Sequence, residues 1–214
     1  HRHADDLSEV RALVKREDRA RLDAELEHVT DVEDAHAHPE LGVGDRERTV
    51  DVVVSGRAAV VRELRRLAER GDLAFGTIDS WLVWKLSDGG AHVTDHSNAS
   101  CTGLYDFALG GWDQSLLTAL RIPERMLPQI HFSSEIHART STPSVPGAVP
   151  IAGIAGDQQA AMFGELNTEP GSVKITYGTS AMIDIHVGDF PVLSQRGAYP
   201  LVLCGRNGQR PYCL

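Results

Sequence analysis

The stretch PIAGIAGDQQAAMFG, residues 150–164, is the most informative part of this 214-residue chain. A short apolar run leads into glycines, and a helical pattern then begins at Asp157. Because glycine carries no side chain, another molecule can approach the backbone closely at such a position. The pattern predicts a strand that ends near Ile154, a glycine turn, and a helix from Asp157 to about Leu166.

Asp157 and Gln158 together suggest a chemical role for this turn. We expect Asp157 at the N-cap of the helix, where free N–H groups and the helix dipole keep a carboxylate ionised. The amide of Gln158 lies beside it and can orient a hydroxyl group. This pair suits a base that takes a proton from an alcohol. A purely structural capping Asp explains the same residues, so the motif alone leaves both interpretations open.

A second stretch, KITYGTS at residues 174–180, combines a strand with a tight turn rich in hydroxyl groups. Backbone N–H groups around Gly178 and the hydroxyl of Thr179 could hold a phosphate. An ordinary β-hairpin turn is the alternative interpretation.

The composition excludes several classes of protein. The formal net charge is −9, which argues against a nucleic-acid surface because phosphate binding needs clustered Lys and Arg. No apolar run is long enough to cross a bilayer, and the first residues do not show a signal-peptide pattern. Three cysteines without a C-x-x-C pair indicate reduced thiols in a cytoplasmic protein.

Residues 1–57 differ in composition from the rest. They hold 9 Lys and Arg against 15 Asp and Glu, 5 of the 10 His, and no Phe, Tyr or Trp. Such a segment buries little surface, so we expect disorder or one or two loose helices between Asp5 and Val29, then a linker. An out-of-frame reading of GC-rich DNA would also produce this composition. With no initiating Met before Met126, the chain is expected to be a piece of a longer protein.

From residue 58 onward the sequence is typical of a folded protein. Apolar residues at helical spacing over 60–68 predict a helix that Gly71 stops, and residues 112–120 are the second helix candidate. The stretch 77–86 is apolar and ends at Gly89-Gly90, with Trp81 and Trp84 as core aromatics. Strands are expected over 173–187 and 199–203, with a hairpin turn at 205–208.

Five stretches, taken in order, resemble the glycerol-kinase branch of the FGGY carbohydrate kinases. They are GTIDSWLVWKL (76–86), HVTDHSNAS (92–100), IPERMLP (122–128), GDQQAA (156–161) and TYGT (176–179). One of them alone would be weak evidence, but the ordered series is specific and covers about residues 58–214.

The resemblance implies an incomplete α/β, actin-like (ribonuclease H-like) kinase fold. Residues 58–165 would belong to the first domain and 166–214 to the opening strands of the second. ATP, Mg²⁺ and a small polyol would be the ligands, with no nucleic-acid or membrane partner, and a homo-oligomer is left open. Asp157 matches the family's catalytic base, Gln158 a polyol-binding residue, and Gly178 and Thr179 the second phosphate loop.

The chain also departs from the family. The first phosphate loop, the Arg-Glu pair that grips glycerol and the adenosine-binding glycines have no counterpart. Cys101 and Ser180 stand where glycerol kinases usually have Arg and Gly. The chain alone is therefore expected to be inactive. Another FGGY sugar kinase, or a non-catalytic interaction module, stays open as an alternative.

Other candidate sites rank low, and no metal site is predicted. His36 and His38 form a His-x-His pair without a third ligand. Asn98-Ala-Ser100 is a formal glycosylation sequon. The basic cluster Arg62–Arg66 is typical of a solvated helix face.

Overall fold

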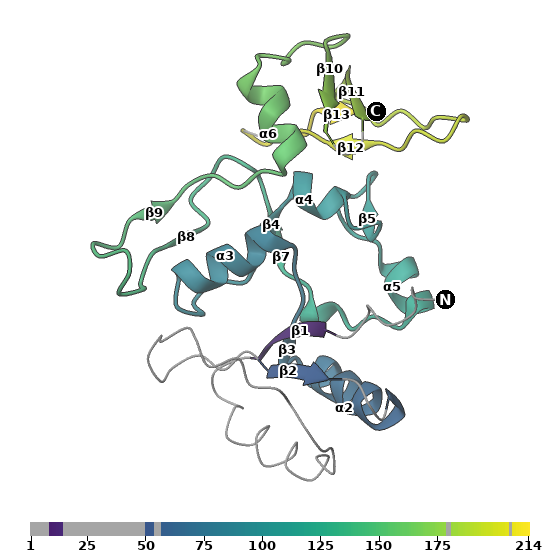
Figure 1. The fold of residues 1–214 in the computed structure, drawn as a ribbon. Helices are drawn as coiled ribbons and strands as arrows, with labels where there is room; N and C mark the ends of the chain where they lie inside the picture. Colours follow the sequence, from purple (N-terminus) through teal and green to yellow (C-terminus); the bar gives the residue numbers. More distant parts are fainter. Residues whose placement is uncertain (1–8, 15–49, 54–56, 179–180, 206) are drawn as a thin grey trace. The chain divides into compact units, whose positions relative to one another are not determined.

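The computed structural model describes residues 9–14, 50–53, 57–178, 181–205 and 207–214. These residues divide into two compact units (Figure 1). The first unit comprises the part of the chain up to Phe75 together with Arg125–Leu127, and the second comprises Gly76–Glu124 and Pro128–Leu214. None of the helices in the described ranges has the length and apolar character that a membrane span requires.

The first unit contains one helix and a small antiparallel sheet. Helix α2 (Arg57–Arg70) ends where Gly71 adopts a φ of +82°, a conformation that glycine tolerates readily. Its buried residues Leu67 and Ala68 pack against Leu73, with Leu64 and Met126 partly buried around them. The predicted helix with an apolar face over residues 60–68, stopped by Gly71, is thereby confirmed.

The sheet of this unit has the strand order β2-β1-β3, formed by Val50–Val53, Glu9–Val14 and Leu73–Ala74. A helix expected within residues 5–29 is wrong at Glu9–Val14, which is a strand. The reason is pairing with distant segments: Val10 lies opposite Val52, and Leu13 lies opposite Ala74. The linker expected over residues 31–48 lies outside the described residues.

The second unit is built around two parallel strands, β4 (Val93–Asp95) and β7 (Gln129–His131). Helix α3 (Ile78–Leu86) packs on this pair through Val83, which contacts the cluster of Val93 and Ile154. Helix α4 (His96–Ser100) starts directly where β4 ends, because the Asp95 carboxylate accepts a hydrogen bond from the Asn98 N–H.

Short elements occupy the connection between β4 and β7 and the segment that follows β7. The hairpin of β5 (Tyr105–Asp106) and β6 (Gly111–Trp112) precedes α5 (Gln114–Leu120), which Asp113 caps. The 3-10 turn η2 (Glu124–Met126) precedes β7, and β8 (Ala138–Arg139) pairs antiparallel with β9 (Pro150–Ile151).

Helix α6 (Asp157–Gly164) and an antiparallel sheet complete the second unit (Figure 1). The sheet has the order β10-β11-β13-β12, from Val173–Tyr177, Ala181–Gly188, Tyr212–Cys213 and Leu201–Val202. The strands predicted over 173–187 and 199–203 are confirmed in part, since the first is divided in two and the second is limited to Leu201–Val202. The predicted return of the chain after residues 205–208 is confirmed by the pairing of β12 with β13, whereas the strand expected to end near Ile154 already ends at Ile151. Met162 of α6 packs against Leu201, Leu203 and Cys213 of this sheet.

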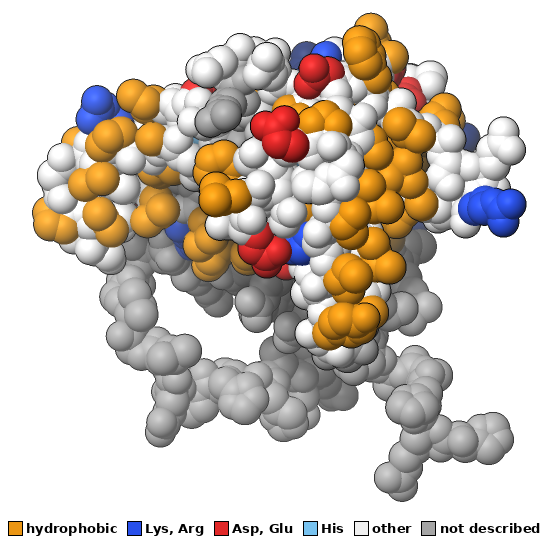
Figure 2. Space-filling model, turned by 90° about the horizontal axis from the view of Figure 1, so that it is seen from above, with side chains coloured by type: hydrophobic (Ala, Val, Ile, Leu, Met, Phe, Trp, Pro, Cys, Tyr) orange, Lys and Arg blue, Asp and Glu red, His pale blue; other side chains and the backbone are white. Residues whose placement is uncertain are grey.

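The apolar face of β10 and β11 is exposed, whereas their polar face is buried. Val173, Ile175 and Ile183 are about half exposed, while Lys174 and Asp184 on the opposite face are almost fully buried. Figure 2 shows hydrophobic side chains gathered in a band on the surface it views. Trp81 is also 40% exposed, so its assignment to the core is wrong, because it lies on the side of α3 away from Val83.

Candidate functional site

The loop before α6 is held by a hydrogen bond to a distant helix. The N–H of Gly156 donates to Ser97 Oγ of α4 at 2.8 Å. Gly156 is buried, and a Cβ at this position would lie 2.3 Å from Gln159 Oε1. A side chain would therefore displace the buried Gln159 amide, which explains why glycine occupies the position directly before Asp157.

Asp157 is the first residue of α6 and not its N-cap, which corrects the prediction from sequence. Gly156 occupies the N-cap with an extended backbone (φ −61°, ψ 148°) and no side chain caps the helix. Asp157 Oδ1 accepts a hydrogen bond from the Gln158 N–H at 2.8 Å, and the side chain is exposed. In the first turn, the positive end of the helix dipole still favours an ionised carboxylate.

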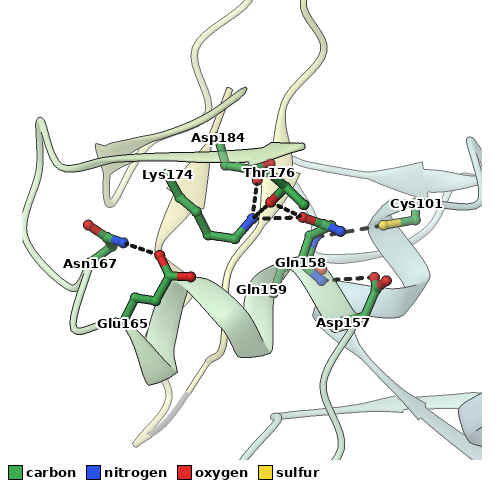
Figure 3. Close-up of polar contacts among 9 residues, drawn as sticks. All are labelled: Cys101, Asp157, Gln158, Gln159, Glu165, Asn167, Lys174, Thr176 and Asp184. Atoms are coloured by element: carbon green, nitrogen blue, oxygen red, sulfur yellow. Dashed lines mark hydrogen bonds and ion pairs between the residues drawn. The ribbon is translucent and has the colours of Figure 1, made fainter. Parts of the chain in front are cut away.

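Gln158 is fixed by a buried charged pair (Figure 3). Its Oε1 accepts hydrogen bonds from Lys174 Nζ at 2.7 Å and from Thr176 Oγ1 at 3.1 Å. Lys174 Nζ also donates to Thr176 Oγ1 and to Asp184 Oδ2, both at 2.8 Å. These three acceptors match the three N–H bonds of an ammonium group, so the Lys174 cation is fully satisfied.

This arrangement determines which end of the Gln158 amide is available. The carbonyl oxygen accepts hydrogen bonds from two donors, whereas the amide NH₂ donates to no acceptor among the described residues. Asp157 thus presents an acceptor and Gln158 presents a donor at the start of one helix (Figure 3). Such a pair can hold two oxygen atoms of a polyol, one that gives a hydrogen bond and one that receives it.

A fully buried carboxylate, Asp95, ties the loop before Asp157 to the rest of the second unit. It accepts hydrogen bonds from Ser97 Oγ at 2.7 Å and from Ser133 Oγ at 2.6 Å. The Asn98 backbone and side-chain N–H groups donate to its other oxygen at 3.0 and 2.8 Å. Since Ser97 also receives the Gly156 N–H, Asp95 fixes the backbone that leads into α6.

The structure describes only some of the remaining candidate residues predicted from sequence. Gly178 is exposed directly after β10, and Thr179 lies outside the described residues, as do His36 and His38. The Asn98 amide is used internally by Asp95, and Ser100 Oγ is buried against the Val202 N–H. The sequon is thus part of the α4 packing.

The three cysteines are free thiols. Burial raises the pKa of Cys204 to about 11 and that of Cys213 to about 12, so both stay protonated at neutral pH. This makes them unreactive in comparison with thiolates.

Sequence reasoning missed Lys174, Asp184 and Asp95, although two signals pointed to them. Lys174 and Asp184 are charged residues within otherwise apolar strands, and the hairpin register places them directly opposite each other. Asp95 is the last residue of β4 and precedes Ser97 and Asn98, which is the pattern of a helix N-terminus. A further group, His131, Glu135 and His137, also gathers in space although no metal site was predicted.

Comparison with known proteins gives consistent results. Residues 60–164 match the FGGY family of carbohydrate kinases, N-terminal domain. A glycerol kinase of Trichlorobacter lovleyi is 51% identical over 150 residues, which are 70% of this chain and 30% of that protein. A glycerol kinase of Shewanella woodyi is 47% identical over 154 residues, which are 72% of this chain and 31% of the relative. The chain therefore spans about 30% of the length of the curated relatives it matches.

Solved structures show the same mixed α/β fold over part of their length. The crystal structure of Plasmodium falciparum glycerol kinase with ADP superposes with a TM-score of 0.67 at 30% identity, covering 71% of this chain and 31% of that one. A gluconate kinase from Lactobacillus acidophilus superposes with a TM-score of 0.55 at 21% identity, covering 64% and 28% of the two chains.

Proposed function

Because this chain belongs to the FGGY family of carbohydrate kinases, we propose that it carries the catalytic base and part of the polyol site of an ATP-dependent kinase. The acceptor is glycerol or a related polyol, in line with the names of the relatives from Trichlorobacter lovleyi and Shewanella woodyi. The observation that carries the proposal is the exposed Asp157 carboxylate beside the fixed Gln158 amide at the start of α6.

In the proposed reaction Asp157 accepts the proton of one polyol hydroxyl. The hydroxyl oxygen forms a bond to the γ-phosphorus of ATP, and the bond between that phosphorus and the β–γ bridging oxygen breaks to release ADP. ATP supplies the phosphoryl group, and Mg²⁺ neutralises charge on its oxygens. The chain's own contribution is orientation: Gln158 donates from its NH₂ to a neighbouring polyol oxygen, which brings the reacting hydroxyl to Asp157.

The nucleotide contacts proposed for this chain are Gly178 and Thr179. Gly178 is exposed at the end of β10 and has no Cβ, so a phosphate could approach the backbone there. The β10 strand also carries Thr176 and Lys174, which reach Gln158 of α6. The strand that precedes the phosphate turn is thus joined by hydrogen bonds to the polyol-binding residue.

We retain a domain boundary near residues 163–171 as part of this proposal, with residues 58–165 in a first domain and 166–214 in a second. The family match ends at residue 164. The β8–β9 ladder and the β10–β13 sheet are separate sheets on either side of that position. Cleavage by a protease within 163–171, with both products remaining folded, would support it. Uniform protection of that segment would argue for a single domain.

A chimera tests the function. The 150-residue segment of the Trichlorobacter lovleyi relative that matches this chain is replaced by the corresponding residues of this chain. Glycerol-dependent release of ADP is then measured by a coupled assay. We expect turnover, and a loss of about 10²–10⁴-fold in kcat for Asp157→Asn. Gln158→Ala is expected to act mainly on the KM for glycerol, since it removes a ground-state contact.

Glu165→Gln is the matched control, because Glu165 is an exposed carboxylate at the other end of α6. It should leave kcat and KM unchanged. A folded chimera that never turns over glycerol would overturn the proposal and favour the non-catalytic interaction module. Normal kcat in the Asp157→Asn chimera would show that Asp157 is only a structural residue of the helix start.

A further inference from the structure

Two histidines and one glutamate gather between the end of β7 and the start of β8. His131 is the last residue of β7, and Glu135 and His137 follow at spacings of four and two residues. One ligand atom from each side chain lies within 4.8 Å of the others. His131 and Glu135 are half-buried, whereas His137 is buried.

His137 is the unusual member of the group. It is 8% exposed, and among the described residues neither ring nitrogen makes a hydrogen bond of ordinary geometry, the Ser133 backbone being only a weaker polar neighbour. Leaving a buried polar group without a partner is costly, so native structures rarely contain one without a reason. A ligand of the loop that accepts a nitrogen lone pair would remove that cost.

The other two side chains already meet at this position. His131 Nδ1 lies 2.5 Å from Glu135 Oε1, and the His131 and His137 ring centroids are 5.6 Å apart. An ordinary His–Glu ion pair would account for the first contact. It would not account for the second, buried imidazole beside it, which makes no hydrogen bond of ordinary geometry within the described residues.

We propose that His131, Glu135 and His137 bind a divalent first-row transition-metal ion, with Zn²⁺ as the reference ion. Two imidazole nitrogens and one carboxylate oxygen form a ligand set typical of such ions, at metal–ligand distances of about 2.0–2.2 Å. In a tetrahedral site these distances place ligand atoms roughly 3.3 Å apart. Side-chain rotations can close the observed separations of up to 4.8 Å.

The ligand set also discriminates between ions. Mg²⁺ prefers oxygen ligands and keeps several waters, so two imidazoles disfavour it. The proposed site is thus distinct in chemistry from the Mg²⁺ that accompanies ATP. Since only three protein ligands are present and two of them are half-exposed, the fourth position is open to water.

The loop that holds the three ligands is connected to the loop before Asp157. Ser133, between His131 and Glu135, donates to Asp95, and its carbonyl oxygen accepts from the Ile154 N–H at 3.0 Å. The His137 N–H donates to the Ile151 carbonyl at 2.9 Å. A bound ion would therefore fix the segment that supports residues 151–156, and slower hydrogen exchange is expected there.

The test uses the full 214-residue chain after treatment with a chelator. All measurements are made in a background with His1, His3, His36 and His38 changed to Ala, which removes both His-x-His pairs of the sequence. Zn²⁺ affinity is measured by competition with a chromophoric chelator, and Co²⁺ reports the ligand geometry through its visible absorption. Thermal melts without metal show whether each variant folds.

We expect one Zn²⁺ per chain and no displacement by a thousandfold excess of Mg²⁺. Glu135→Gln, which keeps the shape of a half-exposed side chain, should weaken Zn²⁺ binding at least tenfold, and His137→Gln should do so more strongly. Glu165→Gln is the matched control and should change nothing. The proposal is overturned if the chain retains no Zn²⁺, or if Glu135→Gln in a folded chain binds Zn²⁺ as tightly as the parent.

Discussion

Replacing Lys174 by Met removes the cation at the centre of the polar cluster that joins α6 to β10 and β11. Lys174 is 3% exposed and its Nζ donates to three acceptors, one of them the buried carboxylate of Asp184. Met has a similar length, so the loss of packing is small. Asp184 remains as an unpaired buried charge, which typically costs about 3–5 kcal/mol in the free energy of unfolding.

A double variant separates the cost of the stranded charge from the loss of packing. In Lys174→Met/Asp184→Leu both charges are gone, and replacing a buried ion pair with apolar residues is often close to neutral. Urea denaturation of the chain, followed by far-UV circular dichroism, should therefore show a large loss of stability for the single variant. The double variant should recover to within about 1 kcal/mol of the parent.

The double variant also tests the orientation of Gln158. Without Lys174 the carbonyl oxygen of Gln158 loses its shortest hydrogen bond, of 2.7 Å, and the amide can rotate. In the chimera we expect a higher KM for glycerol with little change in kcat, as for Gln158→Ala. A single variant that loses less than about 1 kcal/mol, or a stable double variant with normal KM, would refute this account of the cluster.

Three further perturbations test other residues of the second unit. Burial, and then the Arg210 charge, lower the pKa of His96 from 6.5 to about 4. The stability that the neutral His96 side chain contributes is therefore present above pH 6.5 and is lost as the pH falls toward 4. The free energy of unfolding from urea denaturation should decline by up to about 3 kcal/mol over that window. His96→Phe should reduce the decline without abolishing it, because burial also lowers the pKa of His137; an equal decline in the variant would contradict the assignment. Asp95→Ala leaves the hydroxyls of two serines and the Asn98 N–H groups without their acceptor, so a loss of about 3 kcal/mol or more is expected in the same assay, and a loss below 1 kcal/mol would show that water replaces the carboxylate. Ile175→Lys on the exposed face of β10 should reduce concentration-dependent light scattering without lowering the melting temperature; a large drop in that temperature would show that Ile175 is buried in solution.

Much of the local structure of residues 57–214 could be predicted because it depends on neighbouring residues. Gly71, with its positive φ, ends α2 where the apolar spacing stops. The glycine turn before Asp157 marks the start of α6 to within one residue. The strands after residue 172 follow from their β-branched residues and the turn near residue 205. The ordered motifs likewise led to the family that the comparisons bear out.

The sequence by itself determined helices α2, α5 and α6, most of the strands after residue 172 and the two residues, Asp157 and Gln158, on which the proposed chemistry depends. Only the tertiary structure decided how they are held: Lys174 reaches Gln158 across 16 positions of sequence, and Ser133 reaches Asp95 across 38. It also turned the polar face of β10 inward and exposed Trp81. The physical reason is that periodicity shows which residues share a face of an element, whereas the partner of that face is set by packing between segments far apart in the chain.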